Sequence, residues 1–277
     1  MGCRATRGGG RNDGARGRSV TAGIHPTALL DPGAEIGTGV TVGPFAIIGP
    51  GVAVGDGSRI EARAILERNT RLGSEVRIGV GSIIGGDPQD LKYAGEETWV
   101  EIGDRAVIRE YTTVNRGTAA SGTTRVGNDA YLMSYVHVAH DCDIGEGVII
   151  ANGTQLAGHV IVHERATISG LVTIHQFVVI GTFAFVGGSS RVPQDIPPFV
   201  KAVGNPIRLF GLNTVGLQRG GYSSDTIGAL KKAYRMLFNS DLPPGEAVER
   251  IGRECAGVPE VDQLVAFLDH SRRGVPA

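Results

Sequence analysis

Five of the seven histidines lie between residues 137 and 175, and four of these, His137, His140, His159 and His175, are predicted below to converge. An imidazole can take up a proton near neutral pH, so a histidine in a defined setting can act as a general base. Asp141 directly follows His140, and a carboxylate that held this imidazole would fix its tautomer and raise its basicity. Gly158 has no side chain to block a substrate, and its backbone N–H could donate to an oxyanion. These residue types suit acyl transfer.

The nearest candidate nucleophile is Cys142, which belongs to the inward-facing or corner residues of the pattern described below. The residues therefore favour direct attack of a substrate hydroxyl on an acyl group, without a covalent enzyme intermediate. Zinc binding is an alternative, because His137 and His140 are three residues apart and adjoin a corner. Taken singly, each histidine could also be an ordinary surface side chain, but the convergence of four favours a site.

A period of six residues predicts the elements that position these histidines. Every sixth residue is Ile, Leu or Val from Ile24 to Ile84, from Ile102 to Val114 and from Val126 to Val192. Neither a helix nor an ordinary strand has this period, whereas parallel β-helices do. Each hexapeptide is expected to form one short strand and one corner, with the aliphatic residue pointing inward. Gly after the aliphatic residue, and a small residue further on, would allow a tight turn.

Three hexapeptides close one coil of 18 residues, so residues 18 apart are expected to lie above one another. This register predicts that His140, His159 and His175 share one face in three consecutive coils, with His137 at the adjoining corner. One column of third positions holds His140, Gly158, Gln176 and Gln194.

The repeat is interrupted at about residues 86–100 and again at 118–125, and it resumes in phase both times. Both inserts are therefore expected to project outward from corners, where function tends to be located on a rigid scaffold. The first insert carries Gln89, Asp90, Lys92 and Tyr93.

The two ends of the chain differ from the repeat. Residues 1–22 are rich in Arg and Gly and are expected to be a disordered extension, and residues 23–198 form the predicted β-helix. Residues 199–277 are expected to be helical. Amphipathic spacing predicts helices over 224–238, with Ser224 as N-cap, over 246–255 and over 261–271. These helices would cover the open end of the coil.

Composition excludes several function classes. The formal net charge of −1 disfavours a general nucleic-acid binder, and no apolar run is long enough for a transmembrane helix. The three cysteines lack metal-ligand spacing, which is typical of a reduced, cytoplasmic protein. We expect neither a metal nor another cofactor.

Several motifs make the sequence similar to a known family: QDLKYAGE (89–96), IREYTTVNRGT (108–118), HVAHDC (137–142), LAGHV (156–160), HQF (175–177) and GLNTVGLQR (211–219). In order and spacing they resemble the acyl-[acyl-carrier-protein]–UDP-N-acetylglucosamine O-acyltransferase family over residues 24 to about 275. The resemblance implies an all-β solenoid plus α-helices: a left-handed parallel β-helix with a C-terminal helical region. It also implies a homotrimer with sites in grooves between subunits.

The implied reaction is transfer of an (R)-3-hydroxyacyl group from acyl carrier protein to the 3-hydroxyl of UDP-N-acetylglucosamine, which begins lipid A synthesis. By resemblance, His140 matches the general base, Asp141 its supporting carboxylate and Gly158 the oxyanion donor. Gly188 matches the position that gauges acyl length. Matches to substrate-contacting positions are Gln89, Lys92, His137, His159, His175, Gln176, Asn213 and Arg219.

The sequence departs from the best-known members at two positions near the nucleotide. Val215 stands in place of an acidic residue, and Gly220 in place of a second arginine. Two alternatives to the main reading are an acyltransferase that uses a 3-amino sugar nucleotide and a zinc-binding or non-catalytic hexapeptide scaffold.

Overall fold

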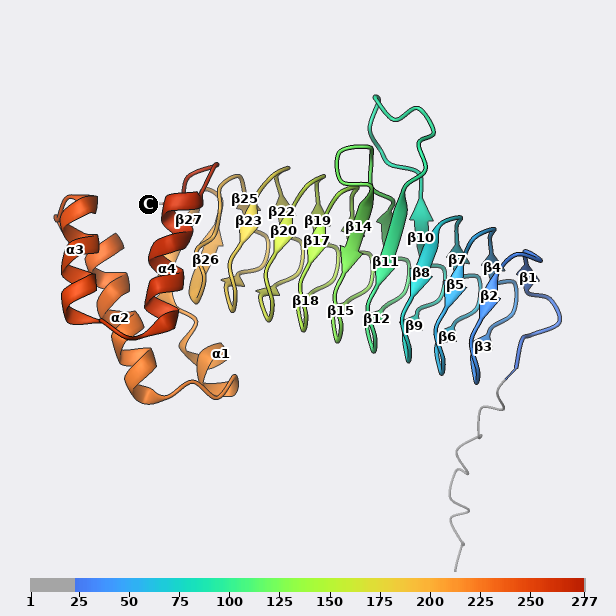
Figure 1. The fold of residues 1–277 in the computed structure, drawn as a ribbon, viewed down its shortest axis with the longest axis horizontal. Coiled ribbons are helices and arrows are strands. Elements are labelled where there is room, and N and C mark those ends of the chain that lie inside the picture. Colours follow the sequence, from blue (N-terminus) through green and yellow to red (C-terminus); the bar gives the residue numbers. More distant parts are fainter. Residues whose placement is uncertain (1–22, 277) are drawn as a thin grey trace, which may run out of the picture.

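The computed structural model describes residues 23–276, and the predicted disordered extension over residues 1–22 lies outside this range. Short strands form three sheets that enclose a long prism, and helices pack at its C-terminal end (Figure 1). Strands of one sheet are parallel and are related by one turn of the coil, as in the pairing of Val138 with Leu156. The chain is therefore a parallel β-helix, as the six-residue period predicts.

The first sheet, called sheet I, has nine parallel strands. Its strands are β1 (Leu29–Leu30), β4 (Ile47–Ile48), β7 (Ile65–Leu66), β10 (Ile83–Gly86), β13 (Thr113–Asn115), β16 (His137–Val138), β19 (Gln155–Leu156), β22 (Thr173–Ile174) and β25 (Arg191–Val192). The second, sheet II, has eight. They are β2 (Glu35–Ile36), β5 (Ala53–Val54), β8 (Thr70–Leu72), β11 (Trp99–Ile102), β14 (Thr123–Val126), β17 (Asp143–Ile144), β20 (Ile161–Val162) and β23 (Val179–Ile180).

The third, sheet III, has ten strands and extends past the last regular coil. Its strands are β3 (Thr41–Val42), β6 (Arg59–Ile60), β9 (Arg77–Ile78), β12 (Val107–Ile108), β15 (Tyr131–Leu132), β18 (Ile149–Ile150), β21 (Thr167–Ile168), β24 (Phe185–Val186), β26 (Val200–Gly204) and β27 (Ile207–Leu212). The last strand is antiparallel to its neighbour β26.

The core is a stack of aliphatic side chains inside the prism. Leu66, Ile84, Leu132 and Leu156, one from each of four coils, are fully buried. Among residues 23–276, the stack is less covered in its first coil, where Ile24 is 48% exposed. Burial of this column stabilises the coil by roughly 1.5–3 kcal/mol for each aliphatic side chain.

The glycines and the left-handed turns occupy different positions at the corners. A Cβ on Gly145 would lie 2.6 Å from the backbone N of Glu164, so glycine directly after the aliphatic residue lets neighbouring coils stack closely. The left-handed φ lies two residues further on and is often taken by other residues, including Asp141 (60°), His159 (60°) and Phe177 (66°). Glycine also occupies this left-handed position at other corners, as at Gly147 (62°) and Gly153 (70°), so glycine serves the turn there, two residues after the position that the close stacking requires.

Both inserts project from the corner where sheet I leads into sheet II (Figure 1). The first is shorter than expected, residues 87–98 between β10 and β11. The second covers residues 116–122, because Thr123 to Arg125 belong to β14 and pair with β11. Thr124 is buried inside the prism, which explains why this segment continues the coil.

The C-terminal part begins with strands rather than helices. β26 pairs with β24 and β27 turns back on it, so sheet III covers the end of the coil. The helices follow: α1 (Thr214–Arg219), α2 (Ser224–Phe238), α3 (Pro244–Glu254) and α4 (Pro259–His270). The side chain of Ser223, not Ser224, caps α2. Among residues 23–276, no helix is long and apolar enough to cross a membrane.

Candidate functional site

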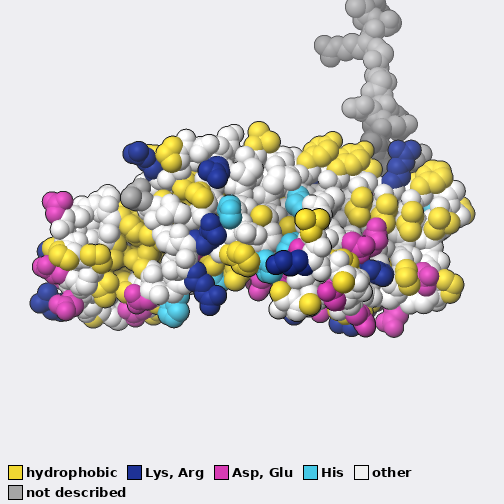
Figure 2. Space-filling view, turned by 90° about the horizontal axis from the view of Figure 1, so that it is seen from above, with side chains coloured by type: hydrophobic (Ala, Val, Ile, Leu, Met, Phe, Trp, Pro, Cys, Tyr) yellow, Lys and Arg dark blue, Asp and Glu magenta, His cyan; other side chains and the backbone are white. Residues whose placement is uncertain are grey.

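The corner that connects sheet I to sheet II, here called the insert corner, holds both inserts and most of the predicted site. It consists of the segments that follow the strands of sheet I, among them residues 87–98, 116–122, 139–142, 157–160 and 175–178. Figure 2 looks onto the side from which the longer insert projects, and histidine side chains are visible beside it. The rigid coil thus places side chains from distant parts of the sequence along one edge.

His140 and Asp141 form a hydrogen-bonded pair at this corner. His140 Nδ1 lies 2.7 Å from Asp141 Oδ2, and the His140 side chain is 13% exposed while that of Asp141 is fully buried. The other ring nitrogen, Nε2, has no hydrogen-bond partner within residues 23–276. With Nδ1 donating to the carboxylate, Nε2 is free to accept a proton.

Asp141 is held by the second insert as well as by His140. Its Oδ1 accepts from Thr118 N at 2.9 Å and from Ser121 Oγ, and its Oδ2 accepts from Thr118 Oγ1 at 2.8 Å. Burial opposes ionisation of Asp141, but the hydrogen bonds from Ser121, His140 and Thr118 outweigh it and lower its pKa to about 2. The carboxylate is therefore charged at neutral pH and can stabilise an imidazolium on His140.

Gly158 lies directly beneath the imidazole of His140, one coil further along the chain. A Cβ at Gly158 would lie 2.5 Å from His140 Cε1, so only glycine fits under the ring in this position. The N–H of Gly158 donates to no acceptor in the described part of the chain. Proline, which has no backbone N–H, occupies the equivalent corner position at Pro32 and Pro50. The coil therefore does not depend on a hydrogen bond from the N–H at this position. This N–H is available to a ligand beside His140.

Two further rings extend the pair. His159 packs edge-on against His140 with ring centroids 5.2 Å apart, and its Nε2 lies 3.6 Å from Asp141 Oδ2. Phe177 stacks on the other side of His159 at 4.6 Å. Asp141, His159 and Phe177 occupy one column in successive coils, all with left-handed φ.

The other two histidines of the predicted group have different surroundings. His137 Nδ1 lies 2.7 Å from Thr113 Oγ1, and burial together with the nearby His140 lowers the pKa of His137. His175 is exposed, and its Nδ1 lies 3.2 Å from the carbonyl oxygen of Gln176. The structure therefore brings His140 and His159 into contact, while His137 and His175 lie beside this pair.

The first insert carries Gln89 and Lys92, and both side chains are exposed. Its base is fixed by Arg116, whose side chain is fully buried and donates to the carbonyl oxygen of Gly85 and to Asp87. Arg116 also lies 3.2 Å from the hydroxyl of Tyr93 in the middle of the insert. One buried side chain thus connects the first insert to the coil from which the second insert begins.

Three predicted site residues lie away from His140 within this chain. Gly188 is exposed at the corner between sheets III and I. Asn213 accepts from Gly216 N at 3.2 Å and donates to the carbonyl oxygen of Phe183 at 3.0 Å, so its side chain caps α1. Arg219 is exposed at the end of that helix.

The departure at Gly220 has a local steric cause. A Cβ there would lie 2.6 Å from Phe183 Cε1, so an arginine at this position would require Phe183 to move. Val215 is 58% exposed on α1.

His140, Asp141 and His159 are close enough to share a metal ion, with ligand atoms within 4.8 Å of one another. Asp141 already accepts hydrogen bonds from Thr118, Ser121 and His140, which occupy the lone pairs of both its oxygens. These hydrogen bonds suit a carboxylate that orients His140 better than they suit a carboxylate that binds a metal ion. The zinc alternative paired His140 with His137, but His137 is bound to Thr113 instead.

Sequence reasoning singled out His140, Asp141 and Gly158 but missed Arg116, Thr118 and Ser121. These three lie in or next to the second insert, and their side chains contact residues 20 to 31 positions away. Arg116 offered one signal, because it occupies the corner position of His140 and Gly158 after an inward Val114.

Two family models match the chain. Residues 195–276 match the second domain of UDP-N-acetylglucosamine O-acyltransferase, and residues 123–158 match the bacterial transferase hexapeptide model of six repeats. The two matches fall on the C-terminal part and on the coils that carry His140.

Relatives match over nearly the whole chain. The acyl-[acyl-carrier-protein]–UDP-N-acetylglucosamine O-acyltransferase of Synechocystis is 47% identical over 92% of this chain and 94% of its own length. The protein of the same name from Burkholderia orbicola is 45% identical over 91% and 98%. A solved UDP-N-acetylglucosamine acyltransferase from Bacteroides fragilis is 42% identical, with a TM-score of 0.90 over 91% of this chain and 99% of that one.

These similarities agree with the motifs at the insert corner and with the left-handed parallel β-helix and helical C-terminal region that the resemblance implied. They also establish the chain as an acyltransferase. The chain belongs to the acyl-[acyl-carrier-protein]–UDP-N-acetylglucosamine O-acyltransferase family.

Proposed function

We propose that the protein transfers an (R)-3-hydroxyacyl group from acyl carrier protein to the 3-hydroxyl of UDP-N-acetylglucosamine, the first step of lipid A synthesis. The observation that carries the proposal is the His140–Asp141 pair, whose imidazole packs against Gly158, a residue with a backbone N–H that donates to no acceptor within residues 23–276. The names of the relatives supply the substrate classes.

The mechanism begins with His140 as general base. Its Nε2 takes the proton from the 3-hydroxyl while the oxygen attacks the thioester carbonyl carbon, and a C–O bond forms. Asp141 stabilises the imidazolium that results, and the N–H of Gly158 stabilises the oxyanion. When the tetrahedral intermediate collapses, the C–S bond breaks and the imidazolium returns the proton to the leaving thiolate.

No covalent enzyme intermediate is needed. Cys142 is the thiol nearest to His140 in the sequence, but burial raises its pKa to about 12 and its Sγ lies 3.2 Å from the carbonyl oxygen of Ala157. A buried, protonated thiol is a poor nucleophile. Direct attack by the sugar hydroxyl fits this site better.

A homotrimer would complete the site. Gly188 lies at the next corner of the prism and Arg219 on α1, so one chain does not gather them beside His140. A neighbouring copy packed along the prism could bring its own Gly188 or α1 toward the insert corner. Light scattering after size exclusion tests the assembly, since a monomer that keeps full activity would contradict it.

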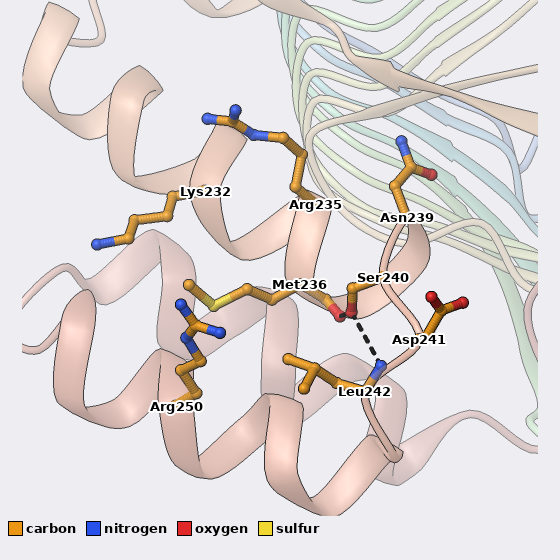
Figure 3. Close-up of a pocket in the computed structure, with 8 residues that line it drawn as sticks. All are labelled: Lys232, Arg235, Met236, Asn239, Ser240, Asp241, Leu242 and Arg250. Carbon is orange, nitrogen blue, oxygen red and sulfur yellow. Dashed lines mark hydrogen bonds between the residues drawn. The ribbon is translucent and has the colours of Figure 1, made fainter.

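Basic side chains on α2 and α3 would suit a carrier protein with an acidic surface. Lys232, Arg235 and Arg250 surround a hollow floored by Met236 and Leu242 (Figure 3). Lys232 and Arg250 both pair with Glu254, at 2.6 and 2.7 Å. The Arg235 guanidinium has no acidic partner among residues 23–276, which leaves it available to a carrier.

The experiment is a transfer assay with carrier protein loaded with 3-hydroxyacyl chains of several lengths. Acceptors are UDP-N-acetylglucosamine and its 3-amino analogue, offered separately. The proposal predicts an ester product from the hydroxyl sugar. Product from the amino sugar alone would identify the amide-forming alternative, and no product from either would contradict acyl transfer to these acceptors.

A further inference from the structure

The second insert, residues 116–122, closes over Asp141 and contacts both oxygens of its carboxylate. The backbone N–H of Thr118 donates to Oδ1 at 2.9 Å, and the hydroxyl of the same residue donates to Oδ2 at 2.8 Å. Ser121 Oγ also donates to Oδ1. Because one residue holds the two oxygens in different directions, the carboxylate cannot rotate about its Cβ–Cγ bond without losing a hydrogen bond.

The orientation of this carboxylate matters because two imidazoles lie within its reach. Asp141 Oδ2 is 2.7 Å from His140 Nδ1 and 3.6 Å from His159 Nε2, so it forms a hydrogen bond with the first ring and none with the second. The two rings touch edge to face, with centroids 5.2 Å apart. The direction in which the carboxylate points therefore decides which histidine it pairs with.

The main chain at Asp141 does not fix the direction of the carboxylate by itself. The residue has a left-handed φ of 60°, and its backbone N–H donates to Thr124 Oγ1 at 2.8 Å. Both features fix the backbone and leave the side-chain torsions free. Within residues 23–276, the hydrogen bonds to the carboxylate other than that of His140 all come from Thr118 and Ser121. The second insert is thus the part of the described chain that selects the orientation.

The second insert is itself a closed turn that can hold its hydroxyl groups in place. Gly122 N donates to the carbonyl oxygen of Thr118 at 2.7 Å, and Ala120 N donates to Thr118 Oγ1 at 3.2 Å. Thr118 is only 9% exposed. The turn follows β13 and leads into β14, two strands of the rigid coil (Figure 1). The donors to Asp141 are therefore fixed by the fold and do not have to be ordered by substrate.

We propose that Thr118 and Ser121 are positioning residues for the general base: they hold the Asp141 carboxylate toward His140 Nδ1 and thereby select the tautomer of His140. The inference rests on the proposed function. With its proton on Nδ1, neutral His140 keeps a lone pair on Nε2 that can accept the proton of the sugar hydroxyl. In the other tautomer the proton lies on Nε2, and the ring cannot act as a base from that atom.

The test uses variants that remove the hydroxyl groups one at a time. Thr118→Val has nearly the same shape, loses the hydroxyl and keeps the backbone N–H, whereas Thr118→Ser keeps both donors. Ser121→Ala removes the other hydroxyl, alone or together with Thr118→Val. The control is Ser134→Ala, because Ser134 Oγ likewise donates to a carboxylate, that of Glu110 at 2.7 Å, but at the corner between sheets III and I.

The first readout is the tautomer of His140 in the resting full-length protein, without substrate. Nitrogen-15 NMR of the histidine rings at about pH 8.5, above the usual pKa of histidine, distinguishes the two neutral tautomers. The His140 signals are assigned by their loss in His140→Ala. We expect the proton on Nδ1 in the unaltered protein, in Thr118→Ser and in the control, and a mixture of tautomers in the Thr118→Val/Ser121→Ala variant.

The second readout is steady-state transfer with loaded carrier protein and UDP-N-acetylglucosamine. We expect kcat to fall roughly 10-fold in Thr118→Val and roughly 100-fold in the double variant, since each loses hydrogen bonds to a charged group. KM for both substrates should change little, because neither hydroxyl is proposed to contact substrate. Thr118→Ser and the Ser134→Ala control should keep nearly the kcat of the unaltered protein.

Three outcomes would overturn the inference: an unchanged tautomer in the double variant, an equal loss of kcat in Thr118→Ser and Thr118→Val, or a rise in KM with kcat unchanged. If the double variant fails to fold, the comparison of Thr118→Val with Thr118→Ser decides the question by the same two readouts. Failure of the proposed function looks different, because the unaltered protein would then transfer no acyl group, while the NMR measurement still reports whether the second insert sets the tautomer.

Discussion

The imidazole of His140 covers Gly158 so closely that a Cβ at position 158 would lie 2.5 Å from His140 Cε1. The two residues are one coil apart, so the spacing of the coil itself sets this contact. Any side chain at residue 158 must displace the ring or push the coils apart. The position of the His140 ring against this coil therefore depends on glycine at residue 158.

Gly158→Ala should cost activity without unfolding the protein. The methyl group would move His140 away from its productive position, and we expect kcat to fall by about 100-fold or more, in the range of a lost general base. Steady-state transfer assays measure this. The matched control is Gly228→Ala, because a Cβ there meets nothing within 4 Å and alanine favours the α2 helix. Equal activity of the two variants would contradict the steric account.

Asp141→Asn should remove a pH-dependent part of stability. The folded pKa of Asp141 is about 2, below the unfolded value of about 4, so its contribution is present above pH ~4 and is lost as pH falls through about 2. The free energy of unfolding of the variant should be about 2–3 kcal/mol lower at pH 6, and the difference should shrink toward pH 2. Chemical denaturation at both pH values checks this, and a constant difference would be inconsistent with an ionised, hydrogen-bonded Asp141.

Arg116→Met should loosen the first insert. The variant loses the hydrogen bonds to Gly85 and Asp87 that fix the base of residues 87–98. We expect faster proteolysis within this segment and a raised KM for substrate with a smaller change in kcat. Arg105→Met is the control, since Arg105 is an exposed corner arginine paired with Asp129 at 2.7 Å. If both variants resist protease as well as the unaltered protein, Arg116 does not anchor the insert.

Cys142→Ala should keep turnover within a few-fold of the original. The buried thiol, whose pKa is raised to about 12 by burial, takes no part in the proposed direct attack. The assay is joined to mass spectrometry of protein quenched during turnover. An acyl adduct on Cys142, or loss of transfer in a folded variant, would require a covalent intermediate instead.

Gly188→Met should shift donor preference toward shorter acyl chains. A Cβ at Gly188 would lie 3.3 Å from the carbonyl oxygen of Gly170 and 3.8 Å from Ser169 Cβ, so a side chain can be accommodated there with a small adjustment. A bulky residue would then fill the end of the slot for the acyl chain. Competition between donors of different lengths measures the preference, and an unchanged profile would refute the role of this position as a ruler.

Much of the fold could be predicted because the coil repeats a local rule. Each inward aliphatic residue, such as Leu132 or Leu156, needs only its neighbours 18 residues away to be buried. The strands at the C-terminal end could not be predicted from the 18-residue period, because Ala202 pairs with Val186, which lies only 16 residues earlier. The prolines between them shorten that coil and break the period.

The candidate site could be predicted only in part. The neighbouring positions of His140 and Gly158 could be predicted, because residues 18 apart in this repeat lie above one another in successive coils. Ser121 and Thr118 could not be found this way, because their contact with Asp141 depends on how the second insert folds back. Gly188 and Arg219 lie away from His140 within one chain, and the repeat of one chain does not specify how copies pack in the proposed homotrimer.

The most direct test of the account is the turnover of His140→Ala with loaded carrier protein and UDP-N-acetylglucosamine. His163→Ala serves as control, because His163 is an exposed histidine that follows sheet II rather than sheet I. The account predicts a loss of about 10²- to 10⁴-fold in kcat for His140→Ala and near-full activity for the control. Near-full turnover by a folded His140→Ala variant would contradict the central claim that His140 is the general base.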